Sequence, residues 1–200
     1  MRIWLVWIFL VISANATTNM WVSTGNAYGI EPRLLYAISK VESNLRPYNV
    51  SVNYKKISKA QQERLYKFLK YRNIPHYTFT QVIEIQNKNL SQAKAVVNFL
   101  DKNHYASFDI GLMNINNIHK KSLAKKHISL INLLDENVNL KVAAGILLNC
   151  YKKHGSSYEA INAYNGKVKN NPYYSKVFSV LQNLLLPNED ASKELFYCVL

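Results

Sequence analysis

This chain has few cysteines, no cluster of histidines and no long apolar run after its N-terminal region. It has only two cysteines, Cys150 and Cys198, and neither lies in a metal-ligand or nucleophile pattern. Its five histidines do not have the spacing of zinc ligands, so we expect no metal site and no cofactor. After the N-terminal region no segment is apolar enough to cross a membrane, and the chain has no internal repeat or low-complexity tract.

Acidic residues are also few. The 200-residue chain has 12 Asp and Glu against 25 Lys and Arg, which gives a formal net charge of +13. Such a balance favours anionic partners: nucleic acid, anionic lipid or an acidic cell-wall polymer. The lysines are dispersed rather than gathered into one basic tract.

The N-terminus has the three parts of a secretory signal peptide. Arg2 precedes an apolar run over 3–12, and Ala14 and Ala16 form a small-x-small end. We therefore expect a signal peptide at 1–16, a mature protein from Thr17, and a location in the periplasm or cell envelope. An uncleaved N-terminal anchor is the alternative, although the run is about half the roughly 20 residues that a membrane span needs. Export disfavours nucleic acid as a partner, and in an oxidising compartment Cys150 and Cys198 could form a disulfide.

The helical patterns dominate the rest of the chain. Ser58 with Gln61 predicts a helix start, and a further helix opens at Ser91. An apolar stripe from 140 to 151 predicts a helix that ends at Gly155. Ser156 with Glu159 begins a short helix, and Pro172 begins a last helix that turns Tyr173, Val177, Leu181, Leu184 and Leu185 inward. The β-branched and aromatic segment 77–85 predicts one short strand.

A carboxylate lies on one of the apolar helical stripes. Leu35, Ile38, Glu42 and Leu45 recur at helical spacing after Pro32. Burial of a Glu raises its pKa, and a carboxylic acid kept protonated near neutral pH can give a proton to a leaving group. A Glu that reaches solvent at the helix edge, or pairs with a neighbouring basic residue, is the simpler interpretation.

Three segments favour the catalytic interpretation. They read VESNLRP at 41–47, YASFDIGLMNIN at 105–116 and AINAYNG at 160–166. In this order they resemble the lytic transglycosylases with a goose-type lysozyme fold, and the resemblance covers roughly 28–186. It implies a mainly α, lysozyme-like α+β fold: a helical bundle around a glycan-binding groove with a small β element, over 17–186, followed by a tail at 187–200.

The resemblance also implies the chemistry. Glu42 would protonate the oxygen between N-acetylmuramic acid (MurNAc) and N-acetylglucosamine (GlcNAc) in peptidoglycan, then deprotonate the C6 hydroxyl to give 1,6-anhydro-MurNAc ends. Tyr164 would hydrogen-bond Glu42 or stabilise positive charge on the sugar. The expected substrate-binding residues are Ser43, Met113, Asn114, Asn116, Tyr164 and Asn165. A core role for Tyr164 and Met113, and a cap or turn role for Ser43 and Asn165, are the alternatives. Asp109, the one rival carboxylate, is expected to order its loop.

The segments 90–100 and 108–111 are similar to the small transglycosylases of conjugation, type IV and type III secretion, and pilus systems. An envelope-spanning machine would then be a partner besides the glycan strands. The chain departs from the family pattern at Asn114, where Gln is usual, and in an inserted lobe over about 53–89. A hydrolytic lysozyme and a weakly active wall-binding assembly factor remain the alternative functions.

Overall fold

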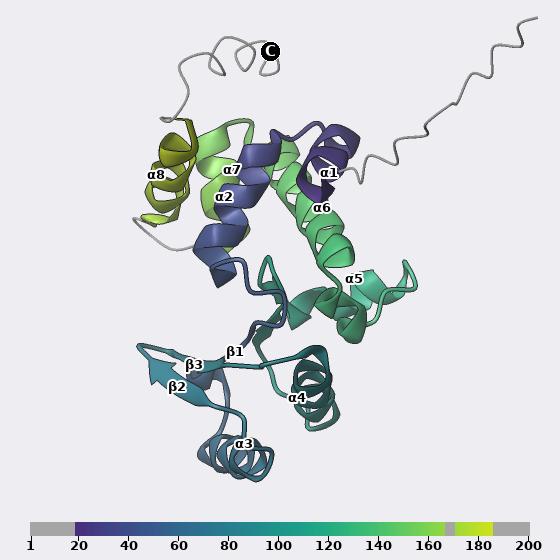
Figure 1. The fold of residues 1–200 in the computed structure, drawn as a ribbon, viewed down its shortest axis with the longest axis vertical. Helices are drawn as coiled ribbons and strands as arrows, with labels where there is room; N and C mark the ends of the chain where they lie inside the picture. Colours follow the sequence, from purple (N-terminus) through teal and green to yellow (C-terminus); the bar gives the residue numbers. More distant parts are fainter. Residues whose placement is uncertain (1–18, 167–170, 186–200) are drawn as a thin grey trace, which may run out of the picture.

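The computed structural model describes residues 19–166 and 171–185. The expected signal peptide at 1–16, the tail at 187–200 and Cys198 lie outside these residues. The described chain forms a helical part and a part built on a β-sheet, one above the other in Figure 1.

The helical part is made from both ends of the described chain. Its members are α1 (Met20–Tyr28), α2 (Pro32–Ser43), α6 (Glu136–His154), α7 (Ser157–Asn165) and α8 (Tyr173–Leu185). The predicted helix ends are confirmed at Gly155, which closes α6 with a left-handed φ of 74°, and at Ser156, whose side chain caps α7. In α8, Tyr173 and Val177 are buried as expected, whereas Leu184 is 37% exposed and was wrongly predicted to face inward.

The sheet has five strands in the order β2-β3-β1-β4-β5, and every neighbouring pair is antiparallel. The strands are β1 (Val50–Asn53), β2 (His76–Phe79), β3 (Val82–Ile85), β4 (Phe108–Ile110) and β5 (Ile115–Asn116). The prediction of one strand over 77–85 was wrong. Thr80, with a φ of 49°, and Gln81 form a turn that folds this segment into the hairpin of β2 and β3.

The segment 53–89 folds into regular elements. It contains the 3-10 helix η1 (Tyr54–Lys56), the helix α3 (Lys59–Tyr71) and the β2–β3 hairpin. The capping box predicted at Ser58 and Gln61 is confirmed at the start of α3. The next helix, α4 (Leu90–Lys102), begins one residue before the predicted Ser91 because Asn89 is its N-cap.

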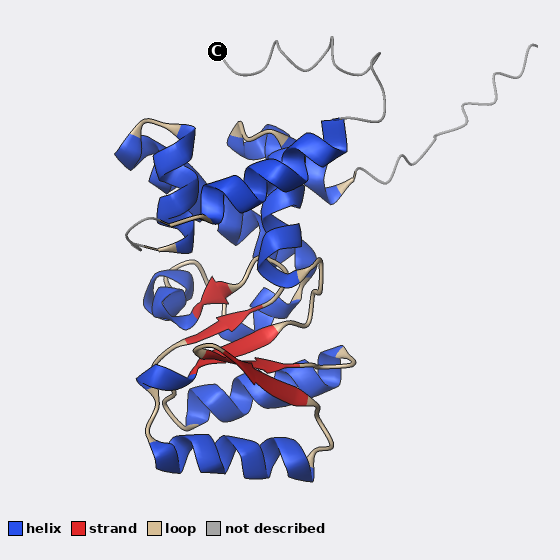
Figure 2. Ribbon diagram, turned by 90° about the vertical axis from the view of Figure 1, so that its left-hand side faces the viewer, coloured by secondary structure: helices blue, strands red, loops and turns tan. Residues whose placement is uncertain are grey.

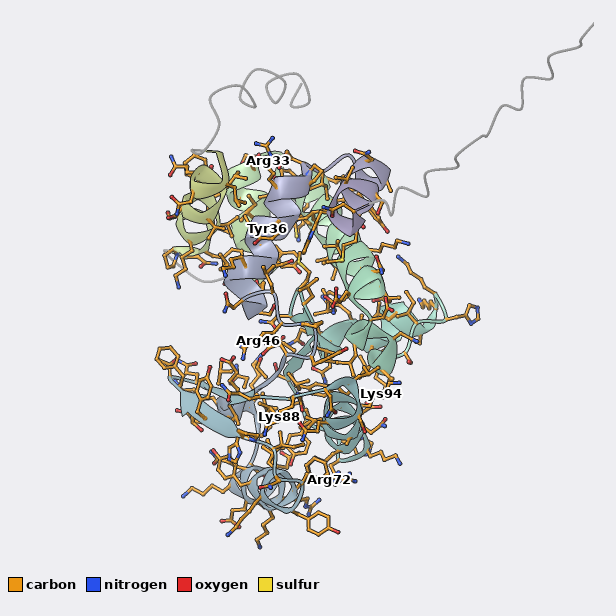
Figure 3. The ribbon with its side chains drawn as sticks, viewed as in Figure 1. Arg33, Tyr36, Arg46, Arg72, Lys88 and Lys94 are labelled. Atoms are coloured by element: carbon orange, nitrogen blue, oxygen red, sulfur yellow. The ribbon has the colours of Figure 1, made fainter. Side chains whose placement is uncertain are left out.

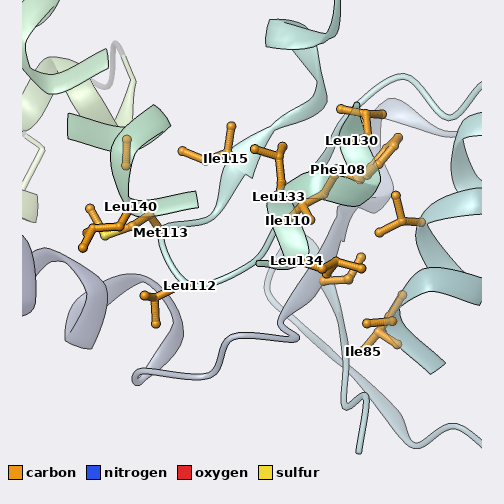
Figure 4. Close-up of a cluster of buried hydrophobic side chains, with 14 of the residues drawn as sticks. Ile85, Phe108, Ile110, Leu112, Met113, Ile115, Leu130, Leu133, Leu134 and Leu140 are labelled. Atoms are coloured by element: carbon orange, nitrogen blue, oxygen red, sulfur yellow. The ribbon is translucent and has the colours of Figure 1, made fainter. Parts of the chain in front are cut away.

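The sheet has one apolar and one polar face. In the views of Figures 1 and 2, α3 and α4 lie on one side of the sheet and the helical part on the other. The side chains of Ile83, Ile85, Val52, Phe108 and Ile110 are completely buried, as strict alternation along the strands requires. Figure 4 shows how this core continues through Leu133 and Leu134 of the 3-10 helix η3 (Leu130–Leu134).

The predicted class is confirmed: a mainly helical, lysozyme-like α+β fold with a small sheet. The two remaining short helices, η2 (Asn117–His119) and α5 (Lys120–Ala124), follow β5. Within 19–166 and 171–185, no helix is both long and apolar enough to span a membrane.

Candidate active site

Glu42 lies in the last turn of α2, where the chain leaves the helical part for the sheet. Leu35 and Ile38 of the same stripe are completely buried, and Glu42 is half-buried. The helix ends before Leu45, which therefore does not continue the stripe as predicted. Asn44 and Leu45 both have left-handed backbones, with φ of 55° and 62°, and this unusual pair of conformations turns the chain sharply after the carboxylate.

Two neutral donors hold the Glu42 carboxylate. The Tyr173 hydroxyl, at the start of α8, donates to Oε1 over 2.5 Å. The Asn114 amide Nδ2 donates to Oε2 over 3.2 Å and to the Glu42 backbone oxygen over 2.6 Å. The carboxylate is thus oriented by side chains from two other segments of the chain.

Burial dominates the ionisation of Glu42. Loss of solvent raises its pKa from the ordinary value of 4.5 to about 7, although the hydrogen bonds from Tyr173 and Asn114 act in the opposite direction. Asp109 adds a smaller upward effect through its negative charge, and the Asn165 side chain a smaller downward one. Near neutral pH both the acid and the carboxylate are therefore populated, as a group that first gives and then takes a proton requires.

Asn114 is itself held in one orientation. Its Oδ1 accepts a hydrogen bond from Asn49 Nδ2 over 2.8 Å, which leaves Nδ2 to face Glu42. Its φ of 47° lies in the left-handed region, which Asn tolerates better than most residues. Asn49 is buried and was not singled out from the sequence.

The segment that carries Asn114 is fixed by Asn139 of α6. Asn139 Nδ2 donates to the backbone oxygens of Ile110 and Leu133, over 2.9 and 2.8 Å, and its Oδ1 accepts from the Met113 backbone N–H over 2.8 Å. Gly111 has a left-handed φ of 79° and passes close to this amide. A Cβ at this position would lie 2.3 Å from Asn139 Nδ2. The predicted glycine segment is therefore tied to a residue that sequence reasoning missed.

Two expected sugar-binding residues lie inside the structure instead. Met113 is completely buried, with the Ser39 hydroxyl against its sulfur, and takes the core role that was the alternative. Ser43 is 1% exposed and donates to the Leu112 backbone oxygen over 2.7 Å. These two side chains connect α2 to the 111–114 segment, and neither is open to a sugar in this structure.

Tyr164 and Tyr173 exchange the roles that the sequence suggested. Tyr164 donates to the Met113 backbone oxygen over 2.9 Å and does not hydrogen-bond Glu42. Tyr173 makes that bond instead, and its own pKa is raised, first by burial and then by the Glu42 charge. In the sequence, Tyr173 is the first residue of the predicted inward-facing stripe, and the other members of that stripe are aliphatic. Its hydroxyl group was the feature that could have indicated a polar role.

The end of α7 positions Tyr173. Asn162 Oδ1 accepts from the Tyr174 backbone N–H over 2.9 Å, and Asn171 Oδ1 accepts from the Tyr173 backbone N–H over 3.1 Å. Asn165 is exposed, and its Oδ1 accepts from Asn171 Nδ2 over 3.3 Å. The third sequence motif, 160–166, therefore supports the first turn of α8. This motif contains two predicted site residues, Tyr164 and Asn165, and of these Asn165 is exposed to solvent.

Asp109 has the ordering role that the sequence suggested. Its Oδ1 accepts from Asn116 Nδ2 over 2.7 Å and its Oδ2 from the Ser51 hydroxyl over 3.3 Å. Burial raises the pKa of Asp109, and these two hydrogen bonds lower it. Asn116 also accepts from the Ile118 backbone N–H over 3.0 Å, so its side chain fixes β5 and the start of η2.

The described residues contain no group of three His, Cys, Asp or Glu side chains that could hold a metal ion. At the centre of the site the carboxyl group of Glu42 is held by two neutral partners, Tyr173 and Asn114. Its pKa of about 7 suits this group to proton transfer.

Comparisons with known proteins agree with this capacity. The family model described as the transglycosylase SLT domain matches residues 19–176. The chain is similar to the invasion protein IagB of Salmonella typhimurium and of Salmonella typhi, at 27% identity over 159 residues that cover 79% of this chain and 68% of the relative. No solved structure matches significantly. The chain belongs to the SLT domain family and is a peptidoglycan lytic transglycosylase of the cell envelope.

Proposed function

We propose that Glu42 is the single acid and base of the reaction, acting on the β-1,4 bond between MurNAc and GlcNAc. The protonated carboxyl gives its proton to the glycosidic oxygen while the bond from that oxygen to C1 of MurNAc breaks. The resulting carboxylate then takes the proton of the C6 hydroxyl as O6 bonds to C1. The products are a 1,6-anhydro-MurNAc end and a free GlcNAc hydroxyl, and Glu42 is again protonated.

The observation that carries this proposal is the environment of the carboxyl group. Burial holds the pKa of Glu42 at about 7, and the partners that hydrogen-bond it, Tyr173 and Asn114, are neutral. A neighbouring Lys or Arg would favour the carboxylate and remove the acid. Tyr173 and Asn114 orient the group and still leave the acid form populated at neutral pH.

The surroundings of Asp109 support a mechanism with one carboxylate. Glycosidases that use two carboxyl groups need the second one free to attack the sugar or activate water. Both oxygens of Asp109 accept hydrogen bonds from Asn116 and Ser51 within the sheet. An internal nucleophile, the C6 hydroxyl of the substrate, needs no second carboxylate.

Mass analysis of the muropeptides released from purified peptidoglycan tests the proposal. We expect products that are lighter by one water molecule than the hydrolysed fragments, because the anhydro bond replaces the reducing end. Products with ordinary reducing ends would identify a hydrolytic lysozyme and would overturn the transglycosylase step.

We also propose that the protein is exported and opens the wall for a secretion, conjugation or pilus machine. The support is the signal-peptide pattern at 1–16 and the similarity to a relative named as an invasion protein. N-terminal sequencing of the protein from the cell envelope should begin at Thr17. In cells, a Glu42→Gln variant should fail to restore assembly of the machine, whereas full restoration would favour a wall-binding factor that does not need catalysis.

A further inference from the structure

A row of polar side chains crosses the whole sheet. Tyr77 pairs with Glu84, Glu84 with Ser51, Ser51 with Asp109, and Asp109 with Asn116. Residues paired directly opposite one another in antiparallel strands point to the same face, so these five side chains form one continuous polar row. The row spans four inter-strand spacings, or about 19 Å at roughly 4.8 Å for each spacing.

The polar row lies on the face of the sheet that looks toward Glu42. Arg46, in the loop that follows α2, donates to Glu84 of the row and to the Ser43 backbone oxygen. Figure 3 places Arg46 between α2 and the sheet. Asp109, in the same row, is close enough to Glu42 for its charge to act on that carboxyl group.

The row contains no Lys or Arg, and its two carboxylates both accept hydrogen bonds. Glu84 is paired with Arg46, and Asp109 accepts from Ser51 and Asn116. Ser51 is buried and both oxygens of Asp109 already accept hydrogen bonds. Tyr77 is exposed, Glu84 and Asn116 are half-buried, and their polar groups suit the hydroxyl and N-acetyl groups of a glycan. A nucleic acid or an anionic lipid would instead require unpaired cations along the row.

Two exposed aromatic rings stand at the far end of this face. Tyr77 is 45% exposed and Phe79 is 70% exposed, and they share a face of β2 because they are two residues apart. The opposite face of β2 is the one that packs on α3, where the Tyr66 ring stacks on His76 at 5.0 Å. The rings of Tyr77 and Phe79 therefore contribute nothing to the packing of α3. Exposed apolar groups beside a polar surface are typical of a binding site.

We propose that Tyr77 and Phe79 form a distal sugar-stacking subsite for the glycan strand that occupies Glu42, with the polar row as the path between them. The apolar C–H face of a pyranose ring packs on an aromatic ring, while the hydroxyls at its edge reach polar neighbours such as Glu84. This inference rests on the proposed function in its choice of ligand, a peptidoglycan glycan strand. It assigns the β2–β3 hairpin of the 53–89 segment to substrate binding.

The subsite predicts a dependence on glycan length. A short oligosaccharide that fills only the surroundings of Glu42 cannot reach β2, whereas a long strand can. Replacement of Phe79 should therefore weaken the binding of long strands and leave the binding of short ones unchanged. Stacking on one ring corresponds to roughly a three- to tenfold change in affinity.

The experiment compares Phe79→Ala with Tyr71→Ala, both in a Glu42→Gln background so that the ligand is not consumed. Tyr71 is a matched control because it is 87% exposed, belongs to the same segment, and lies in the last turn of α3 outside the polar row. The ligands are peptide-free glycan strands of long chain length and a tetrasaccharide. The melting temperature of each variant checks the fold.

We expect Phe79→Ala to bind long strands three- to tenfold more weakly than Tyr71→Ala and to bind the tetrasaccharide equally well. Equal binding of long strands by the two variants would overturn the subsite. Equal binding together with loss of function in cells by Phe79→Ala in a chain that keeps Glu42 would overturn it as well and indicate a protein partner on β2. Because the assay measures binding without turnover, its outcome is separate from a failure of the proposed chemistry.

Discussion

The Tyr173 hydroxyl and the Glu42 carboxylate, 131 positions apart in the sequence, meet over 2.5 Å and join the first turn of α8 to the last turn of α2. The bond places a neutral donor on the group that we propose as the acid and base. It also makes the geometry of the carboxyl group depend on how α8 is packed.

Tyr173→Phe tests the importance of this bond. We expect kcat to fall by about ten- to a hundredfold, or about 1.4 to 2.7 kcal/mol, because the carboxyl group loses an orienting partner. The lost donor had lowered the pKa of Glu42, so the basic limb of the pH–rate profile should move to higher pH. A lower melting temperature with an unchanged pH profile would show a purely structural role.

Tyr164→Phe should behave differently. Its hydroxyl donates to the Met113 backbone oxygen, and its removal leaves that buried oxygen without this partner. We expect a loss of about 1 to 2 kcal/mol in the free energy of unfolding. The basic limb of the pH–rate profile should stay in place, and a shift as large as that of Tyr173→Phe would contradict the separation of the two roles.

Glu42 should reduce the stability of the folded protein above neutral pH. Its pKa is about 7 in the folded protein against 4.5 ordinarily, so the folded state holds the proton more tightly than the unfolded state. The stabilisation is complete below pH 4.5 and is lost as pH rises through 7, with a total change on the order of 3 kcal/mol.

Glu42→Gln removes this titration. We therefore expect the variant to be more stable than the wild type at pH 8 and to lose less stability between pH 5 and pH 8, measured by denaturant unfolding. If the free energy of unfolding changed with pH in the same way for the two proteins, Glu42 would not be held in its acid form.

Gly111 and Gly29 form a matched pair for the segment beneath Asn114. Both have a left-handed backbone, with φ of 79° and 64°, but a Cβ at Gly29 meets nothing within 4 Å. At Gly111 it would lie 2.3 Å from Asn139 Nδ2 and 2.4 Å from the Leu133 backbone oxygen. Gly29→Ala should cost about 1 kcal/mol of stability, whereas Gly111→Ala should cost about 3 kcal/mol or more and reduce activity. Equal losses from the two substitutions would contradict the close packing around Asn139.

The sequence singled out Glu42, the carboxylate that we propose as the acid and base, but not the partner that orients it. Glu42 could be found because its stripe, with Leu35 and Ile38, is local and periodic, and because three motifs follow in a known order. The Tyr173 contact depends on the packing of α8 against α2, which no local pattern encodes. The sequence therefore favoured Tyr164, which lies inside a motif.

The same limit applies to the sheet and to Asn139. Strands of two to four residues, such as β5 and β4, are too short to show a clear alternation. For the same reason the 77–85 pattern predicts one strand, although the segment forms a hairpin. Asn139 stands in the first turns of α6, where a polar residue suggests only an exposed helical position. Its three hydrogen bonds arise because α6 passes directly behind the 110–113 segment.

The rate of peptidoglycan lysis by Glu42→Gln is the most direct test of the account. The amide keeps the size of the carboxyl group: its oxygen can accept from Asn114 Nδ2 while its nitrogen donates to the Tyr173 hydroxyl oxygen, but it cannot transfer a proton. We predict a loss of lysis of at least about a thousandfold, roughly 4 kcal/mol, with glycan binding and fold retained and no anhydro products detected by mass analysis. A variant that kept a large fraction of wild-type lysis would contradict the claim that Glu42 is the acid and base.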